Sequence, residues 1–270
     1  MTFKTIDFST FSSIRIGPKV DVAVIENDHV PEGRTIVGSA NNLLVSPTPP
    51  PLMILSKEYD FIRIEEDRLI IGAATPGGRV VSFCKKNDIA NFEYLSKLPG
   101  TIGGMLKMNA GLKEFEIFNH LIAIRTPGGW IPKEAIGYGY RKTSISEVVF
   151  EAAFELEKGF SYERLEMFAQ MRSNQPHDPS AGSCFKNPHN DYAGRLIEAV
   201  GLKGKRQGGM AFSEVHANFL VNYGGGTYEE ALSLIHEAQE RVLREFGIEL
   251  QCEIVILDEF MLTKKTRKTT

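Results

Sequence analysis

One short segment of this chain brings together three side chains that can do polar chemistry. Ser183, Lys186 and Asn187 supply a hydroxyl, an ammonium group and an amide within five residues, and Pro188 closes the segment because proline stops regular secondary structure. A serine hydroxyl can donate a proton where a neighbouring charged group tunes it, and such a polar cluster is typical of a loop that contacts a ligand. A structural turn rich in serine and asparagine explains the segment equally well, so both interpretations stay open here.

Glycines gather in a second segment, residues 98–111. It reads Leu98-Pro99-Gly100-Thr101-Ile102-Gly103-Gly104 and continues to Met108-Asn109-Ala110-Gly111. Four glycines within twelve residues let the backbone approach a ligand closely with its N–H donors exposed, which suits a pyrophosphate. The segment is not a Walker loop, because no Gly-Lys-Ser/Thr follows, and its spacing is not Gly-x-Gly-x-x-Gly. A merely structural, turn-rich segment is the alternative.

Two further segments carry weaker signals. The first, Gly38-Ser39-Ala40-Asn41-Asn42-Leu43-Leu44, follows a predicted strand, and its small and amide side chains can hold phosphate or ribose. An ordinary loop is the alternative. The second, Tyr138-Gly139-Tyr140-Arg141, places a guanidinium beside phenols. Arg141 can neutralise a carboxylate or a developing anion, or it can stack on a tyrosine and serve packing alone.

Composition excludes several classes of function. The net charge of −3 argues against nucleic acid or a membrane surface as the main partner, and no apolar run is long enough to span a membrane. Residues 1–7 lack the apolar core of a signal peptide. Cys84, Cys184 and Cys252 have no metal-type spacing, so we expect no metal site, a reducing cytosolic setting and a small buried side chain at Cys184. The oligomeric state stays open, with a monomer as the working expectation.

The first half of the chain is predicted to be rich in β-structure. Alternating apolar residues and turn signals predict strands over residues 20–25, 34–38, 52–56, 62–71 (turning at Glu66-Asp67) and 150–156, and a hairpin that joins 121–125 to 130–132. Between two of these strands lies Ser46-Pro47-Thr48-Pro49-Pro50-Pro51, which excludes both helix and central strand. We therefore expect a small first part of the chain to end near residue 51.

Helical patterns begin after Gly159. Ser161 is predicted to cap a helix that carries Leu165, Phe168 and Met171 on one face. A second helix starts with a capping box at Thr227 and Glu230, has Ala231, Ile235, Ala238, Val242 and Phe246 on one side, and ends at Gly247. A final strand over residues 250–256 should alternate Leu250, Cys252, Ile254 and Ile256 with polar residues. Together these patterns predict an α+β chain that changes from β-rich to mixed α/β structure near residue 160.

These segments, in this order, resemble the UDP-N-acetylenolpyruvoylglucosamine reductase family, flavoenzymes also called UDP-N-acetylmuramate dehydrogenases. The resemblance covers nearly the whole chain, from Ser12-Ser13-Ile14-Arg15-Ile16-Gly17 to Glu253. It is carried by Pro99-Gly100-Thr101-Ile102-Gly103-Gly104, Asn109-Ala110-Gly111, Tyr140-Arg141, Gly182-Ser183-x-Phe185-Lys186-Asn187-Pro188 and Leu250-x-x-Glu253-Ile254. No single piece suffices, but the set is specific.

The resemblance implies an α+β fold. It is expected to have a two-part FAD-binding region of the vanillyl-alcohol-oxidase (PCMH) type and a C-terminal α/β substrate-binding domain. On this basis we expect residues 1–51 and 52–159 to form two FAD-binding subdomains, residues 160–262 to form the substrate-binding domain, and residues 263–270 to form a basic tail. The implied setting is the cytoplasm, and the implied role is peptidoglycan precursor synthesis for the cell wall.

The resemblance also implies an activity. FAD, bound non-covalently, would take electrons from NADPH and reduce the enolpyruvyl group of UDP-N-acetylglucosamine enolpyruvate. Ser183 would protonate the α-carbon as general acid, while Arg141 and Glu253 would orient and stabilise the enolate. Tyr140, Lys186 and Asn187 would contact the substrate. The expected cofactor-binding residues are Gly38, Ser39, Asn41, Asn42, Leu43, Pro99, Gly100, Thr101, Gly103, Gly104, Asn109, Ala110 and Gly111.

The chain departs from the family pattern in places. The family's Gly-Gly-Gly-Ser-Asn is Gly38-Ser39-Ala40-Asn41-Asn42 here, and the usual Ala-Tyr-Gly after Asn-Ala-Gly is Leu112-Lys113-Glu114. Only 41 residues (142–182) separate Arg141 from Ser183, which resembles the short subtype without the tyrosine-bearing substrate loop. Other groups must then hold the substrate diphosphate. Two other functions stay open: another flavin oxidoreductase on the same scaffold, and a non-catalytic sugar-nucleotide-binding module.

Two carboxylates of the predicted last strand compete for the catalytic role. Glu249 and Glu253 are four residues apart, which would put them on one face of the strand about 13 Å from each other. Glu249 follows the helix end at Gly247 and should be half exposed. Glu253 lies mid-strand, where burial can raise a carboxyl pKa. The family pattern also selects Glu253.

Overall fold

A computed structural model describes residues 1–259, and the chain forms two compact units. Unit 1 comprises Met1–Lys4, Val22–Ser39 and Leu52–Ser173, and unit 2 comprises Thr5–Asp21, Ala40–Pro51 and the chain from Asn174 on. The division into 1–51, 52–159 and 160–262 stays a prediction, and the expected basic tail 263–270 lies outside the described residues. No helix within residues 1–259 combines the length and the apolar character of a membrane span.

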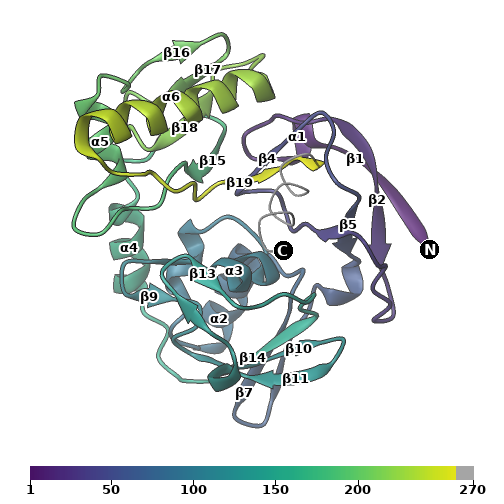
Figure 1. Ribbon diagram of the computed structural model, residues 1–270. Helices are drawn as coiled ribbons and strands as arrows, with labels where there is room; N and C mark the ends of the chain where they lie inside the picture. The colour runs from purple at the N-terminus through teal and green to yellow at the C-terminus, as the bar shows by residue number, and fades with distance from the viewer. Residues whose placement is uncertain (260–270) are drawn as a thin grey trace. The chain divides into compact units, whose positions relative to one another are not determined.

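The main sheet of unit 1 has five antiparallel strands in the order β11-β10-β14-β7-β6 (Figure 1). Their bounds are β6 Ile62–Glu65, β7 Arg68–Gly72, β10 Leu121–Thr126, β11 Gly129–Pro132 and β14 Glu151–Glu155. Glu65 pairs with Arg68 and Thr126 pairs with Gly129, so each hairpin has a two-residue turn. Both turns fall where the sequence predicts them, because turn-forming residues between β-rich runs specify a hairpin locally.

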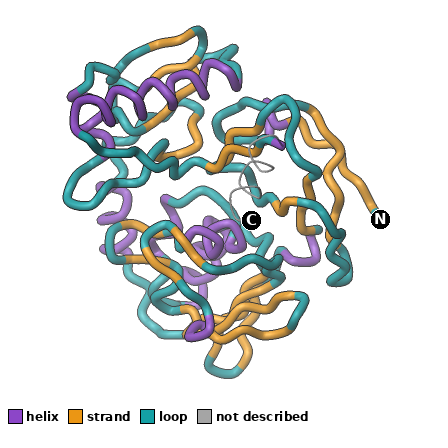
Figure 2. Tube along the Cα trace, viewed as in Figure 1, coloured by secondary structure: helices purple, strands orange, loops and turns teal. Residues whose placement is uncertain are grey.

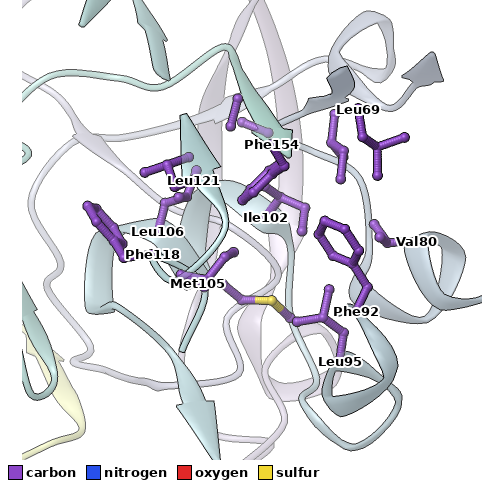
Figure 3. Close-up of a cluster of buried hydrophobic side chains, with 14 of the residues drawn as sticks. Leu69, Val80, Phe92, Leu95, Ile102, Met105, Leu106, Phe118, Leu121 and Phe154 are labelled. Carbon is purple, nitrogen blue, oxygen red and sulfur yellow. The ribbon is translucent and has the colours of Figure 1, made fainter. Parts of the chain in front are cut away.

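Three helices and a short 3-10 turn pack against this sheet. They are α2 Gly77–Asn87, η2 Glu93–Lys97, α3 Ile102–Met108 and α4 Tyr162–Met171. The Ser161 hydroxyl accepts a hydrogen bond from the Arg164 N–H, as the predicted cap requires. Figure 3 shows Ile102, Met105 and Leu106 of α3 among the buried side chains of this core. Each such side chain contributes about 1.5–3 kcal/mol when fully buried, so the core fixes the glycine-rich start of α3.

A smaller sheet has the order β1-β2-β5-β3. Its strands are β1 Thr2–Asp7, β2 Lys19–Ile25, β3 Thr35–Ile36 and β5 Leu52–Leu55, with the short helix α1 Phe8–Phe11 after β1 and the 3-10 turn η1 Lys57–Tyr59 after β5. Within unit 1, β5 pairs in parallel with both β2 and β3, and Ala23 lies opposite Met53. The parallel pairing brings the end of β3, just before Gly38, into the core of unit 1.

Unit 2 contains a four-stranded antiparallel sheet in the order β15-β18-β17-β16. Its elements are β15 Ser180–Ser183, α5 Ala193–Ala199, β16 Arg206–Gln207, β17 Met210–Phe212, β18 Phe219–Asn222 and α6 Tyr228–Phe246. Helix α6 lies along one face of this sheet (Figure 1). Its predicted capping box and its end at Gly247, with φ +66°, are confirmed. Of the five residues predicted on one side of this helix, four are buried (Ala231, Ile235, Ala238 and Val242), whereas Phe246 at the last position is 38% exposed.

The predicted last strand over residues 250–256 is wrong in its extent. Strand β19 is only Val255–Leu257, and it pairs in parallel with β4 Leu43–Val45. Figure 2 shows the stretch between α6 and β19 as loop. Leu250 and Ile254 are buried in the unit 2 core, which satisfies the apolar alternation without a ladder of hydrogen bonds. Periodicity alone could not reveal that residues 250–254 form only an isolated bridge, between Cys252 and Phe185, and no continuous ladder.

Candidate functional site

Two segments predicted to bind flavin meet in unit 1. A Cβ atom on Gly38 would lie 2.9 Å from the Thr101 hydroxyl oxygen, so residue 38 must be glycine for the two segments to lie this close. Gly38 and Ser39 belong to unit 1, whereas Asn41, Asn42 and Leu43 belong to unit 2. The predicted 38–43 segment is therefore shared between the units.

In the glycine-rich segment at the start of α3, some glycines pack against neighbouring residues and others expose their backbone. Gly100 has φ +136°, a conformation that a residue with a side chain rarely adopts. The N–H of Gly103 donates to the Ala73 carbonyl (2.8 Å), and a Cβ on Gly103 would lie 3.1 Å from the Ala73 Cβ. Gly104 is exposed, and the nearest atom to its ideal Cβ is 3.7 Å away. The prediction that the whole segment offers free N–H donors is thus corrected for Gly103, which packs α3 onto the end of β7.

Asn109 ends α3 in a left-handed conformation, with φ +45°, and is fully buried. Its amide nitrogen donates to the Glu116 carboxylate (2.6 Å) and to the Gly139 carbonyl (3.2 Å), and its amide oxygen accepts from the Phe118 N–H (3.4 Å). A Cβ on Gly111 would lie 2.2 Å from the Phe115 carbonyl oxygen. The Asn-Ala-Gly motif therefore has a structural role here, and its contact with flavin stays a prediction.

Arg141 lies at the turn of a short hairpin. Its strands are β12 Tyr138–Gly139 and β13 Lys142–Thr143. Arg141 has φ +53°, which costs a residue with a side chain roughly 1–2 kcal/mol. Its guanidinium donates to the Gly111 carbonyl (2.8 Å) and the Asn109 carbonyl (3.4 Å), and it lies 5.2 Å from the Tyr140 ring centroid. Stacking and hydrogen bonding together fix this positive charge.

A second arginine of unit 1 was missed by the sequence reasoning. Burial lowers the pKa of the Arg172 guanidinium, and the charge of Arg141 lowers it further. Arg172 also donates a hydrogen bond to the Lys97 carbonyl. The positive charge of Arg141 acting on Arg172 favours an anion near these groups. No motif surrounds Arg172 at the end of α4, so only the fold could reveal this pair.

In unit 2, Ser183 and Glu253 come from segments that are hydrogen-bonded to each other. The Cys184 carbonyl accepts from the N–H groups of Glu253 (2.9 Å) and Ile254 (3.3 Å). The Asn42 amide donates to the Glu253 carbonyl (2.9 Å), and the Asn42 carbonyl accepts from the Val255 N–H (2.9 Å). Three residues predicted from distant parts of the sequence therefore lie together.

Asn218 is a second residue that the sequence reasoning missed. Its side chain accepts from the Phe185 N–H (3.0 Å) and donates to the Phe185 carbonyl (2.8 Å), while its backbone carbonyl accepts from the Cys184 N–H (2.7 Å). The residue is buried. These three bonds hold the backbone that directly follows Ser183. A lone asparagine in the turn before β18 gives no sequence signal for this role.

The remaining members of the polar segment have distinct surroundings. The N–H of Lys186 donates to the Gln251 carbonyl (2.9 Å), and the side chain is half-buried. The Asn187 amide oxygen accepts from the Ala193 N–H (3.1 Å), so it caps the start of α5. Cys184 is buried, which confirms the expected small buried side chain. Burial also raises the pKa of its thiol well above the usual range.

Comparison with known proteins adds the family. Residues 175–257 match the sequence profile described as UDP-N-acetylenolpyruvoylglucosamine reductase, C-terminal domain. The UDP-N-acetylenolpyruvoylglucosamine reductase of Helicobacter pylori (strain ATCC 700392 / 26695) is 46% identical over 254 residues, which cover 94% of this chain and 98% of that relative. The enzyme of the same name from Campylobacter jejuni (strain RM1221) is 45% identical over 257 residues, which cover 93% and 99%. This chain belongs to the UDP-N-acetylenolpyruvoylglucosamine reductase family.

The fold agrees with that membership. A crystal structure of UDP-N-acetylenolpyruvylglucosamine reductase from Thermus caldophilus matches with a TM-score of 0.85 at 27% identity, covering 96% of this chain and 100% of that one. The expected α+β class, with a flavin-binding region of the PCMH type and a C-terminal domain, is confirmed.

The structure also separates the two competing carboxylates of this family member. Glu253 is half-buried and its backbone joins the Ser183 segment, whereas Glu249 is exposed. The predicted spacing of about 13 Å along one strand is wrong, because residues 249–253 do not form a strand. The choice of Glu253 thus rests on its neighbours and not on strand register.

Proposed function

We propose that this chain reduces the enolpyruvyl group of UDP-N-acetylglucosamine enolpyruvate to give UDP-N-acetylmuramate, using bound FAD and NADPH, in the cytoplasm. The single observation that carries the proposal is 46% identity to a named reductase over 94% of this chain and 98% of the relative. The proposed product is a precursor for cell wall synthesis.

Residues of unit 1 fit a flavin nucleotide. Gly38 and Thr101 bring two backbone segments together where a Cβ atom would intrude, and Gly104 leaves exposed backbone at the start of α3. A bare backbone of this kind can approach a pyrophosphate closely. We assign Gly38, Ser39, Pro99, Gly100, Thr101 and Gly104 to the flavin from unit 1, and Asn41, Asn42 and Leu43 from unit 2. When bound, FAD supplies the transfer of a hydride from NADPH to the enol ether.

Arg141 supplies fixed positive charge for the substrate. Reduction of the enol ether at its β-carbon leaves an enolate on the pyruvyl carboxylate, so negative charge becomes concentrated there. A guanidinium already held by the Gly111 carbonyl needs no reorganisation when that charge develops. Arg172 strengthens the same positive field, since its pKa responds to Arg141. Tyr140, which is 49% exposed beside Arg141, is assigned to the substrate as well.

Ser183 and Glu253 complete the reaction from unit 2. The Ser183 hydroxyl donates the proton that the α-carbon takes up, and Asn218 keeps the following backbone in place. Glu253 is anchored to the same backbone through the Cys184 carbonyl. Its carboxyl group orients the reacting end of the substrate. Lys186, half-buried on the same segment, is assigned to a substrate contact with Asn187 beside it.

Steady-state assays of the purified protein test this function. The proposal predicts flavin absorption bands, NADPH oxidation that requires the enolpyruvyl sugar nucleotide, and a product two mass units heavier than that substrate. A colourless protein that binds the sugar nucleotide would favour the non-catalytic binding module. A flavoprotein that oxidises NADPH without this substrate, and forms no reduced sugar nucleotide, would favour another flavin oxidoreductase.

A further inference from the structure

Glu116 is linked by hydrogen bonds through Asn109 to Arg141, the arginine that is proposed to bind the substrate. It belongs to β9 Phe115–Glu116, which pairs with β8 Gly111–Leu112 so that Glu116 is opposite Gly111. One carboxylate oxygen of Glu116 accepts from the Asn109 amide nitrogen at 2.6 Å. A hydrogen bond to a charged acceptor is roughly twice as strong as a neutral one. Glu116 therefore determines how the buried Asn109 amide is turned.

The orientation of that amide controls the hairpin that carries Arg141. The Asn109 amide nitrogen also donates to the Gly139 carbonyl (3.2 Å), directly before the Tyr140-Arg141 turn. The Asn109 and Gly111 carbonyls accept from the Arg141 guanidinium. An amide has two N–H donors, so Glu116 and Gly139 together use both. Loss of the Glu116 acceptor would leave a buried donor unpaired and allow the amide to turn away from Gly139.

We infer that Glu116 is a positioning residue for Arg141, acting through the side chain of Asn109. The inference rests on the proposed function, in which Arg141 stabilises the enolate. Glu116 does not itself touch substrate in this account. A displacement of about 1 Å in a positioning group can cost on the order of 100-fold in rate, so the relay is able to control catalysis.

The surroundings of Glu116 make it a good site for substitution. The side chain is half-buried and faces a cavity of about 220 Å³ that Tyr94 and Phe115 also line. A different carboxyl or amide group at residue 116 can therefore be accommodated without a steric clash. Glu116→Gln keeps an oxygen acceptor at the same reach and removes the charge. Glu116→Asp keeps the charge and is one methylene too short for a 2.6 Å contact with Asn109.

The experiment compares both half-reactions in four variants by stopped-flow absorbance. In Glu116→Ala and Glu116→Asp, we expect reoxidation of the flavin by the enolpyruvyl substrate to slow by about 10- to 100-fold. Flavin reduction by NADPH should stay within about twofold in every variant, because Arg141 acts on the enolpyruvyl substrate and not on the transfer from NADPH to the flavin. Glu116→Gln should reoxidise within about twofold of the wild type, and so should the matched control Glu114→Ala, since Glu114 is exposed on the same loop.

Several results would overturn the inference. Reoxidation at the wild-type rate in Glu116→Ala would exclude positioning, and equal loss of both half-reactions or of flavin content would show a merely structural role. If Glu116→Asp reoxidised at the normal rate and Glu116→Gln reoxidised slowly, the effect would come from the charge of Glu116 and not from its contact with Asn109. If the wild type itself fails to reoxidise with the enolpyruvyl substrate, the proposed function fails, which is visible before any variant is compared.

Discussion

Arg141 in unit 1 is held through its own guanidinium, whereas Ser183 in unit 2 is held through the backbone that follows it. The guanidinium donates to two carbonyls and depends on Asn109, and the Ser183 segment is bonded to Asn218 and to the N–H of Glu253. A charge must not move as the reaction proceeds, so hydrogen bonds from the charged group itself to two backbone carbonyls fix it. A proton donor keeps its hydroxyl available, so only its backbone is restrained.

The same contrast separates the two units by task. The glycine-rich segments of unit 1 suit flavin, and the Ser183 and Glu253 pair of unit 2 suits protonation of the substrate. Substitutions in the unit 1 glycines should therefore affect the colour of the protein. Substitutions of Ser183 and Glu253 in unit 2 should leave colour and NADPH reduction intact and affect only reoxidation.

The largest effect is expected at Gly104. Gly104→Val adds a branched side chain to exposed backbone at the predicted pyrophosphate contact, so the purified protein should be colourless, folded and inactive. Gly103→Val is the matched control, because a side chain there collides with Ala73 and should instead lower the free energy of unfolding by about 1–3 kcal/mol. Flavin absorbance and urea unfolding measure the two outcomes. Full flavin occupancy in well-folded Gly104→Val would remove this residue from the cofactor site.

Ser183→Ala comes next. Loss of a general acid costs typically about 100- to 10,000-fold, so reoxidation by the enolpyruvyl substrate should slow by that factor. Reduction by NADPH should stay close to normal, since the hydroxyl acts only when the α-carbon takes its proton. Stopped-flow traces of the two steps give the comparison. An equal slowing of both steps would make Ser183 a structural residue and would end the division of tasks between the units.

Glu253→Gln should slow the same step by roughly 100-fold, the scale of losing one group that stabilises the transition state. Glu249→Gln is the control and should be nearly silent, because Glu249 is exposed and outside the Cys184 backbone contacts. Single-turnover reoxidation rates rank the two variants. A larger defect in Glu249→Gln would contradict the assignment of Glu253.

Arg141→Lys is expected to have the smallest effect of the four. Lysine keeps the charge but loses the planar fork that reaches both the Gly111 and Asn109 carbonyls. We expect weaker substrate binding and reoxidation slower by about 10-fold, equal to about 1.4 kcal/mol, with an unchanged flavin spectrum. Substrate titration measures the loss of binding, and reoxidation kinetics then measure the loss of rate. Unchanged kinetics would restrict Arg141 to packing against Tyr140.

Features set by neighbouring residues could be predicted from the sequence. The Thr227 and Glu230 capping box, the Gly247 helix end and the Thr126 to Gly129 hairpin each depend on residues within one or two turns of chain. The polar segment around Ser183 and the Tyr140-Arg141 pair could also be singled out from their side chains, although a structural role explained each of them equally well. Family resemblance then supplied the roles.

Features that depend on distant partners could not be predicted. The last strand is short because its partner is β4, some 210 residues earlier in the chain, and residues 250–254 form only an isolated bridge, between Cys252 and Phe185. Gly103 proved to be a packing glycine because its neighbour is Ala73. Asn218 and Arg172 entered the site only through tertiary contacts and burial. In each case the local sequence contains only one of the two interacting partners, and the other lies far away along the chain.

An anaerobic single turnover tests the central claim most directly. The wild-type protein is bleached with one equivalent of NADPH, and UDP-N-acetylglucosamine enolpyruvate is then added without oxygen while the flavin absorbance is followed. The account predicts that the oxidised bands return in proportion to UDP-N-acetylmuramate formed. Flavin that stays bleached with this substrate present, in protein that NADPH reduces normally, would contradict it.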